Sequence, residues 1–111
     1  MKKGSSHFLA QRVSALLLIP LLPWFCFALA SLPNSSRADV AGWLHSPVNA
    51  LALAAFIIVG SYHGALGMQV IVEDYVSPGV AQRILLLAGW AVAIGMMALG
   101  PFFIFQIFSG P

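Results

Sequence analysis

The sequence predicts an all-α integral membrane protein with three transmembrane helices. The chain has 111 residues, of which 60% are hydrophobic and only 7% are charged, whereas a soluble domain carries about a quarter charged residues. The few charges lie in short polar stretches that separate long apolar runs. A lipid bilayer imposes this segregation on a chain that crosses it.

Three long runs contain no Asp, Glu, Lys or Arg: residues 13–32, 48–72 and 84–108. Each reaches the roughly 20 residues that a helix needs to cross a hydrocarbon core of about 30 Å. Helices are favoured over strands, because a lone strand leaves backbone polar groups unpaired in lipid and no run alternates like a barrel strand. We therefore expect a single membrane-anchor domain over residues 1–111, with helices at about 13–32, 47–73 and 80–108.

The first predicted helix contains Pro20 and Pro23, which should kink it, while neighbouring helices satisfy the freed carbonyls. Lys2, Lys3, the apolar stretch and the small residues 28–30 also resemble a cleavable secretory signal. Because a run of about 20 apolar residues exceeds the core of about 7 to 15 residues typical of such signals, we expect an uncleaved helix.

The segment 31–45 is predicted to be a loop, with a short interfacial turn around Trp43 and Leu44. Ser46 followed by Pro47 predicts the start of the second helix, because serine is a good N-cap and proline fits the first helical position. The third helix carries Pro101, at which we expect a further kink.

The basic residues predict the orientation. Lys2, Lys3 and Arg12 flank the first helix, and Arg83 lies in the second loop, against Arg37 alone in the first loop. Because basic residues concentrate in cytoplasmic loops, we expect the N-terminus and the second loop to be cytoplasmic and the C-terminus to face outward.

Charge and cysteine content exclude two classes of function. The net charge of +2 is small and scattered, so we exclude a nucleic-acid surface, which needs a clustered basic stripe. The single cysteine, Cys26, cannot form an internal disulfide or a multi-cysteine metal site. The loops are too short to hold a soluble domain, so chemistry is expected in or beside the membrane.

His63 is an ionisable residue inside the second apolar run, where such a group usually has a function because burying it without a partner is costly. Neutral imidazole is a common ligand of haem iron. Gly60 and Gly67 lie on the same helical face, and Gly64 is adjacent, so the glycines would clear a notch for a flat porphyrin. The same residues also suit close helix packing with a histidine hydrogen-bonded to a neighbouring helix.

Two further polar groups are candidates for function. Asp74 is eleven residues after His63, close to three helical turns, and Tyr75 adds a phenol that can donate to a carbonyl oxygen. At the start of the first helix, Arg12 can hold a haem propionate or a quinone oxygen, and His7 is a weaker propionate candidate. Interfacial anchoring to lipid headgroups is the alternative interpretation of both groups.

These residues resemble the hydrophobic membrane anchor of succinate dehydrogenase, the cytochrome b556 small subunit family. In that family a histidine of the second helix is followed by a glycine-methionine step and an aspartate-tyrosine pair, which correspond here to His63, Gly67-Met68 and Asp74-Tyr75. The segment 11–14 is similar to its Gln-Arg-x-Ser/Thr entry to the first helix. The third helix matches in hydrophobicity alone.

The resemblance implies a haem-binding helical bundle built with a second, cytochrome b anchor subunit in a bacterial inner membrane. His63 would be one of two axial ligands of haem b, and Gly60 and Gly67 would line that site. Tyr75 would bind a ubiquinone carbonyl, supported by Asp74 and Arg12. The chain would dock a flavoprotein and an iron–sulfur subunit, and it would not oxidise succinate itself.

Two alternatives remain open at the level of sequence. One is the anchor of a fumarate reductase-type complex, for which the same sequence features are expected. The other is a cofactor-free membrane assembly or transport protein; the lack of a carboxylate in the apolar runs disfavours transport coupled to protons.

Overall fold

The computed structural model describes residues 3–32 and 36–111, and within these residues it is entirely helical. The elements are α1 (Lys3–Ala30), α2 (Arg37–Leu44), α3 (Pro47–Tyr75) and α4 (Val80–Ser109). Among the described residues, α1, α3 and α4 are long and apolar enough to cross a membrane. The predicted all-α class with three membrane-spanning helices is therefore confirmed.

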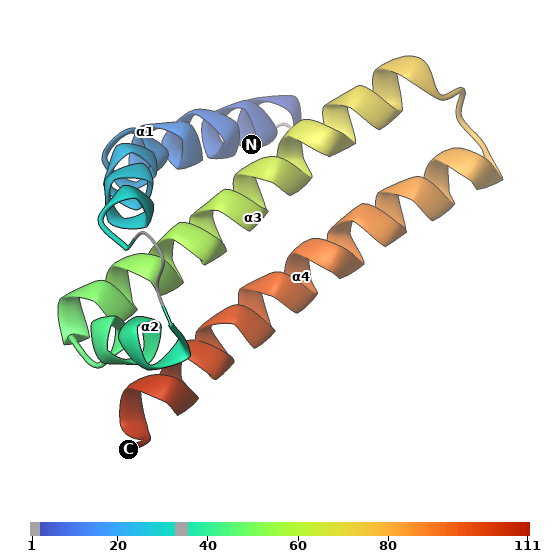
Figure 1. The fold of residues 1–111 in the computed structure, drawn as a ribbon. Helices are drawn as coiled ribbons and strands as arrows, with labels where there is room; N and C mark the ends of the chain where they lie inside the picture. Colours follow the sequence, from blue (N-terminus) through green and yellow to red (C-terminus); the bar gives the residue numbers. More distant parts are fainter. Residues whose placement is uncertain (1–2, 33–35) are drawn as a thin grey trace.

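Helix α1 is longer at its N-terminal end than predicted, beginning at Lys3 instead of near residue 13. The prediction stopped at the charge-free run, but a helix can continue beyond the hydrocarbon core, because its backbone hydrogen bonds are internal and its polar side chains reach water. Pro20 and Pro23 lie inside the helix, and Figure 1 shows it changing direction in its second half. Lys2, used above for orientation, lies outside the described residues.

Helix α2 replaces most of the loop that was predicted between the first two spans. Ser36 caps its N-terminus, accepting a hydrogen bond from the Asp39 backbone at 3.1 Å, while the Asp39 carboxylate accepts from the Ser36 backbone at 3.2 Å. This reciprocal capping box was a readable signal that the prediction missed. The Trp43 ring stacks on Trp24 of α1 with centroids 5.8 Å apart, so α2 is anchored to the first span.

Helix α3 begins where Ser46 and Pro47 predicted, although the Ser46 side chain makes no capping hydrogen bond. The nearby polar contact comes instead from Asn49, whose amide donates to the Trp43 carbonyl at 3.0 Å. The helix then runs without interruption to Tyr75. Asp74 and His63 therefore lie on one continuous helix, about 16 Å apart along its axis.

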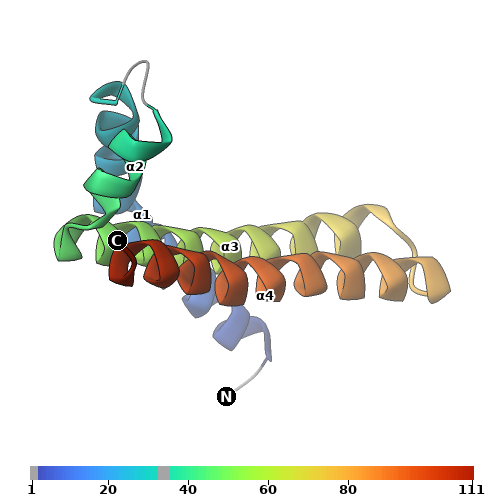
Figure 2. The same cartoon turned by 60° about the horizontal axis from the view of Figure 1, so that its bottom comes forward.

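Helix α3 is the central element of the molecule. Helix α4 runs antiparallel beside it, while α1 packs on a different part of its surface, and in the described residues the backbone of α1 does not approach that of α4 (Figures 1 and 2). Ser14 and Gln11 of α1 lie beside His63 and Gly67 of α3, and Figure 2 shows the start of α1 projecting away from the α3–α4 pair, short of the end of α3. At the opposite end, α2 packs over α3 and α4 around buried Leu44, Ala50 and Ile104.

The closest approach of α3 and α4 that depends on a glycine is at Gly100. A methyl group placed there would lie 2.8 Å from Ile57 Cγ2, and the branched Ile57 side chain has little rotamer freedom in a helix. We expect Gly100→Ala to destabilise the chain by about 1–3 kcal/mol through overpacking, measured by thermal unfolding of the purified protein in detergent. Gly95→Ala is the matched control, because nothing lies within 4 Å of that position; equal melting temperatures for the two variants would contradict the predicted contact.

Candidate functional site

His63 lies near the middle of α3 and faces α1. Its Nδ1 is 2.8 Å from the Ser14 hydroxyl oxygen, and that hydroxyl also donates to the Gln11 carbonyl at 3.0 Å. The predicted ionisable group within the membrane therefore has a partner on a neighbouring helix, which offsets the cost of burying it. Ser14 itself is 4% exposed and is the one buried polar side chain among the described residues.

The other ring nitrogen of His63, Nε2, is available to a ligand from outside this chain. Within the described residues it has no hydrogen bond, and it is not among the buried atoms that lack a partner. Nε2 therefore reaches the molecular surface. A half-buried imidazole held through Nδ1 with Nε2 accessible has the arrangement of a histidine that binds a metal through Nε2.

The sequence suggested that the glycines around His63 clear a single notch, and the structure does not show one. A methyl group on Gly67 would lie 3.5 Å from the Gln11 amide nitrogen on α1, so this side of the histidine is covered. Nothing lies within 4 Å of a methyl group on Gly60 or Gly64. The tertiary structure therefore leaves one flank of His63 open at Gly60 and Gly64 and closes the other.

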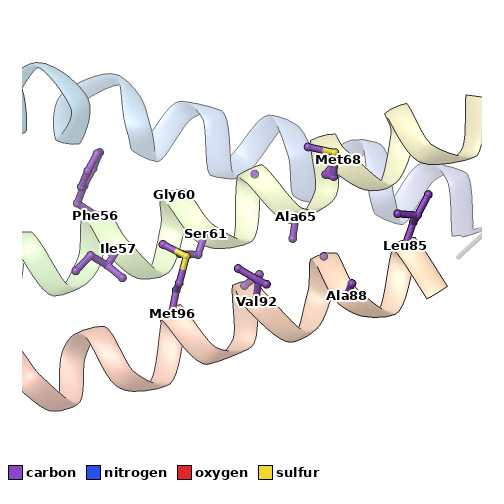
Figure 3. Close-up of a pocket in the computed structure, with 13 residues that line it drawn as sticks. Phe56, Ile57, Gly60, Ser61, Ala65, Met68, Leu85, Ala88, Val92 and Met96 are labelled. Atoms are coloured by element: carbon purple, nitrogen blue, oxygen red, sulfur yellow. The ribbon is translucent and has the colours of Figure 1, made fainter. Parts of the chain in front are cut away.

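Gly60 and Gly64 open onto an apolar groove of about 750 Å³ between α3 and α4. Figure 3 shows Ser61 and Ala65 pointing toward α4, and Val92 and Met96 pointing back toward α3. His63 does not line this groove. A flat ligand of His63 would therefore contact the groove only where Gly60 and Gly64 line it.

A polar stripe on α1 extends from the histidine site toward the N-terminus. It consists of His7, Gln11 and Ser14, which are spaced to share one helical face. The Nε2 atom of His7 and the Oε1 atom of Gln11 are both buried without a hydrogen-bond partner in the described residues. Buried polar atoms are nearly always paired, so these two atoms make the stripe a candidate binding surface for a further polar group.

Arg12 does not join this stripe. It lies about 100° around the helix from Gln11, is exposed, and has its guanidinium 4.9 Å from the centre of the Phe8 ring. The structure therefore brings His63 together with Gln11 and Ser14, and leaves Arg12 on an outer face of α1.

Asp74 and Tyr75 form the polar end of α3. Both are exposed, and Tyr75 retains 85% of its surface as the last residue of the helix. No hydrogen bond or ion pair within residues 3–32 and 36–111 joins them to each other or to Arg12. Both side chains are therefore available to groups beyond this chain.

The three long apolar helices in the described part of the chain define it as a multi-pass membrane protein. The family model described as succinate dehydrogenase/fumarate reductase transmembrane subunit matches residues 1–103. The chain belongs to this family.

The similar curated proteins carry the name succinate dehydrogenase hydrophobic membrane anchor subunit. The relative from Rickettsia bellii is 34% identical over 78% of this chain and 70% of its own length. The relative from Paracoccus denitrificans is 31% identical over 88% of this chain and 83% of its own length. The matched part is smaller for Rickettsia conorii, at 35% identity over 68% of this chain and 61% of the relative. No solved structure matches the chain significantly.

Proposed function

We propose that the chain anchors a succinate dehydrogenase in a bacterial inner membrane, binds haem b together with a sister anchor subunit, and forms part of the ubiquinone-reduction site. The observation that carries this proposal is His63, held at Nδ1 by Ser14 and open at Nε2. The family match supports the anchor role directly. The cofactor and the quinone rest on the chemistry of the residues.

The residues around His63 fit a haem. Nε2 would supply one ligand to the iron, and Gly60 and Gly64 leave space beside it. The other two histidines of this chain are His7 on α1 and His45, whose Nε2 is hydrogen-bonded at 3.2 Å to the Gly110 carbonyl near the C-terminus. A second histidine ligand would come from a partner, which we assign to the sister cytochrome b anchor.

One unpaired polar atom of the α1 stripe, His7 Nε2, also suits this cofactor. The propionates of haem b are anionic acceptors, and an N–H at His7 Nε2 would donate to one of them. Arg12 would reach a propionate or the quinone from the outer face of α1. When bound, haem b would accept and donate one electron at a time.

Tyr75 and Asp74 supply the groups that quinone reduction needs. Ubiquinone accepts two electrons and two protons, so its site requires a hydrogen-bond donor at a carbonyl oxygen and a connection to water. The exposed phenol of Tyr75 can donate, and the neighbouring Asp74 carboxylate can accept and pass on a proton. We place this end of α3 on the cytoplasmic side, where the flavoprotein and iron–sulfur subunits would dock.

A fumarate reductase-type anchor is the second candidate, because the family description covers both enzymes. The two share the same membrane architecture and differ in the direction of electron flow.

Purification of the tagged chain from native membranes tests the proposal. We expect a flavoprotein, an iron–sulfur subunit and a second small membrane subunit to co-purify, with a reduced-minus-oxidised spectrum of haem b and extractable ubiquinone. A haem-free preparation with the catalytic subunits present would leave the anchor role and reject the cofactor. Isolation of the chain without these subunits would reject the anchor role itself.

A further inference from the structure

Ser14 occupies an unusual position for a hydroxyl in a membrane-spanning helix. Its oxygen contacts the Gln11 carbonyl at 3.0 Å and His63 Nδ1 at 2.8 Å, and the side chain is almost completely buried between α1 and α3. A serine that bonds only to the carbonyl three residues earlier needs no second helix. The bond to His63 therefore gives Ser14 a contact that the folding of α1 does not require.

The two contacts of the Ser14 hydroxyl favour one direction for the bond to His63. A hydroxyl has one proton, and a backbone carbonyl can only accept, so both contacts are hydrogen bonds only when the Ser14 proton points to the Gln11 oxygen. The Ser14 oxygen is then an acceptor for His63, which requires a proton on Nδ1. A neutral imidazole carries a single N–H, so Nε2 is left with its lone pair, on the side of the ring that is accessible.

We propose that Ser14 is a positioning residue that holds His63 in the Nδ1–H tautomer and tunes its strength as an iron ligand. The inference rests on the proposed role of His63 as a haem ligand. A hydrogen bond accepted from the far ring nitrogen fixes the orientation of the imidazole and raises the basicity of the ligating nitrogen. A more basic ligand favours ferric over ferrous iron, so Ser14 lowers the reduction potential of the haem.

Potentiometric titration of the haem in the intact complex tests this role. In Ser14→Ala the Nδ1–H loses its acceptor, and we expect bound haem with a raised potential. At fixed ambient potential the ferric-to-ferrous ratio should fall about threefold to tenfold, the range that loss of one neutral hydrogen bond gives. Ser14→Thr keeps a hydroxyl and should restore the potential.

Ser31→Ala is the matched control, because the Ser31 hydroxyl also donates to the carbonyl three residues earlier, Ala28, at 2.8 Å but contacts no histidine. It should leave the potential unchanged. Ser14→Cys is a second test should Ser14→Ala fail to assemble, since it keeps the size of the side chain and replaces oxygen by a weak acceptor. We expect the same upward shift.

Unchanged potentials in Ser14→Ala or Ser14→Cys, with haem bound, would overturn the positioning role. The proposed function can fail separately: His63→Ala with an unaltered haem spectrum would remove the ligand assignment and the Ser14 inference with it. Loss of the spectrum in His63→Ala, together with an unshifted potential in Ser14→Ala, would reject the Ser14 inference alone.

Discussion

Replacement of His63 by alanine is expected to abolish or strongly alter the haem b spectrum of the purified complex. The imidazole would supply one of two axial ligands, and alanine has no atom that can bind iron. The resulting five-coordinate or empty site would lose the sharp reduced bands of a haem with two axial histidines. The reduced-minus-oxidised spectrum, normalised to the flavin content of the same preparation, measures the effect.

His45→Ala provides a matched control for the histidine substitution. His45 is exposed at the end of α2, before α3 begins, and the one hydrogen bond of its side chain within the described residues is to the Gly110 carbonyl. Its replacement should leave the haem spectrum intact. An unchanged spectrum in His63→Ala would reject the ligand assignment, and equal spectral losses in both variants would indicate a general failure of assembly instead.

Replacement of Tyr75 by phenylalanine is expected to reduce electron transfer to ubiquinone at least about tenfold. The change removes one hydroxyl from a side chain that is 85% exposed, so it disturbs little packing within this chain. A hydrogen bond to a reacting carbonyl oxygen contributes about 1.5 kcal/mol or more, and about 1.4 kcal/mol is a factor of ten. Succinate oxidation by an artificial soluble acceptor should be preserved, because that reaction does not need the quinone site.

The second tyrosine of the chain supplies the control. Tyr62 lies on α3 near the histidine, with its ring edge against Trp90 of α4 at a centroid distance of 5.9 Å. Tyr62→Phe keeps that ring contact and should leave quinone reduction close to the wild-type rate. A parallel loss of both activities in Tyr75→Phe would point to failed assembly, and an unimpaired quinone rate would exclude Tyr75 as a donor.

Local structure was largely predictable because a bilayer acts on short segments of sequence. A charge-free run of sufficient length must form a helix in lipid, so the three spans and the start of α3 at Pro47 followed from residue types alone. The alignment of His63 with Asp74 followed from helical periodicity, once α3 continued to Tyr75. The incorrect predictions were also local. Helix α1 continues past the membrane boundary to Lys3, and the capping box at Ser36 and Asp39 was not recognised in the sequence.

The sequence by itself therefore determined three membrane-spanning helices, a histidine within the second of them, and the aspartate and tyrosine at the end of that helix. Only the tertiary structure decided that Ser14 pairs with His63 across 49 residues of chain, that Gln11 covers Gly67, and that Arg12 faces away. Between helices in lipid the hydrophobic effect supplies little preference, so side-by-side pairing depends on small and polar side chains from distant segments. Such pairings leave no periodic pattern in a single sequence.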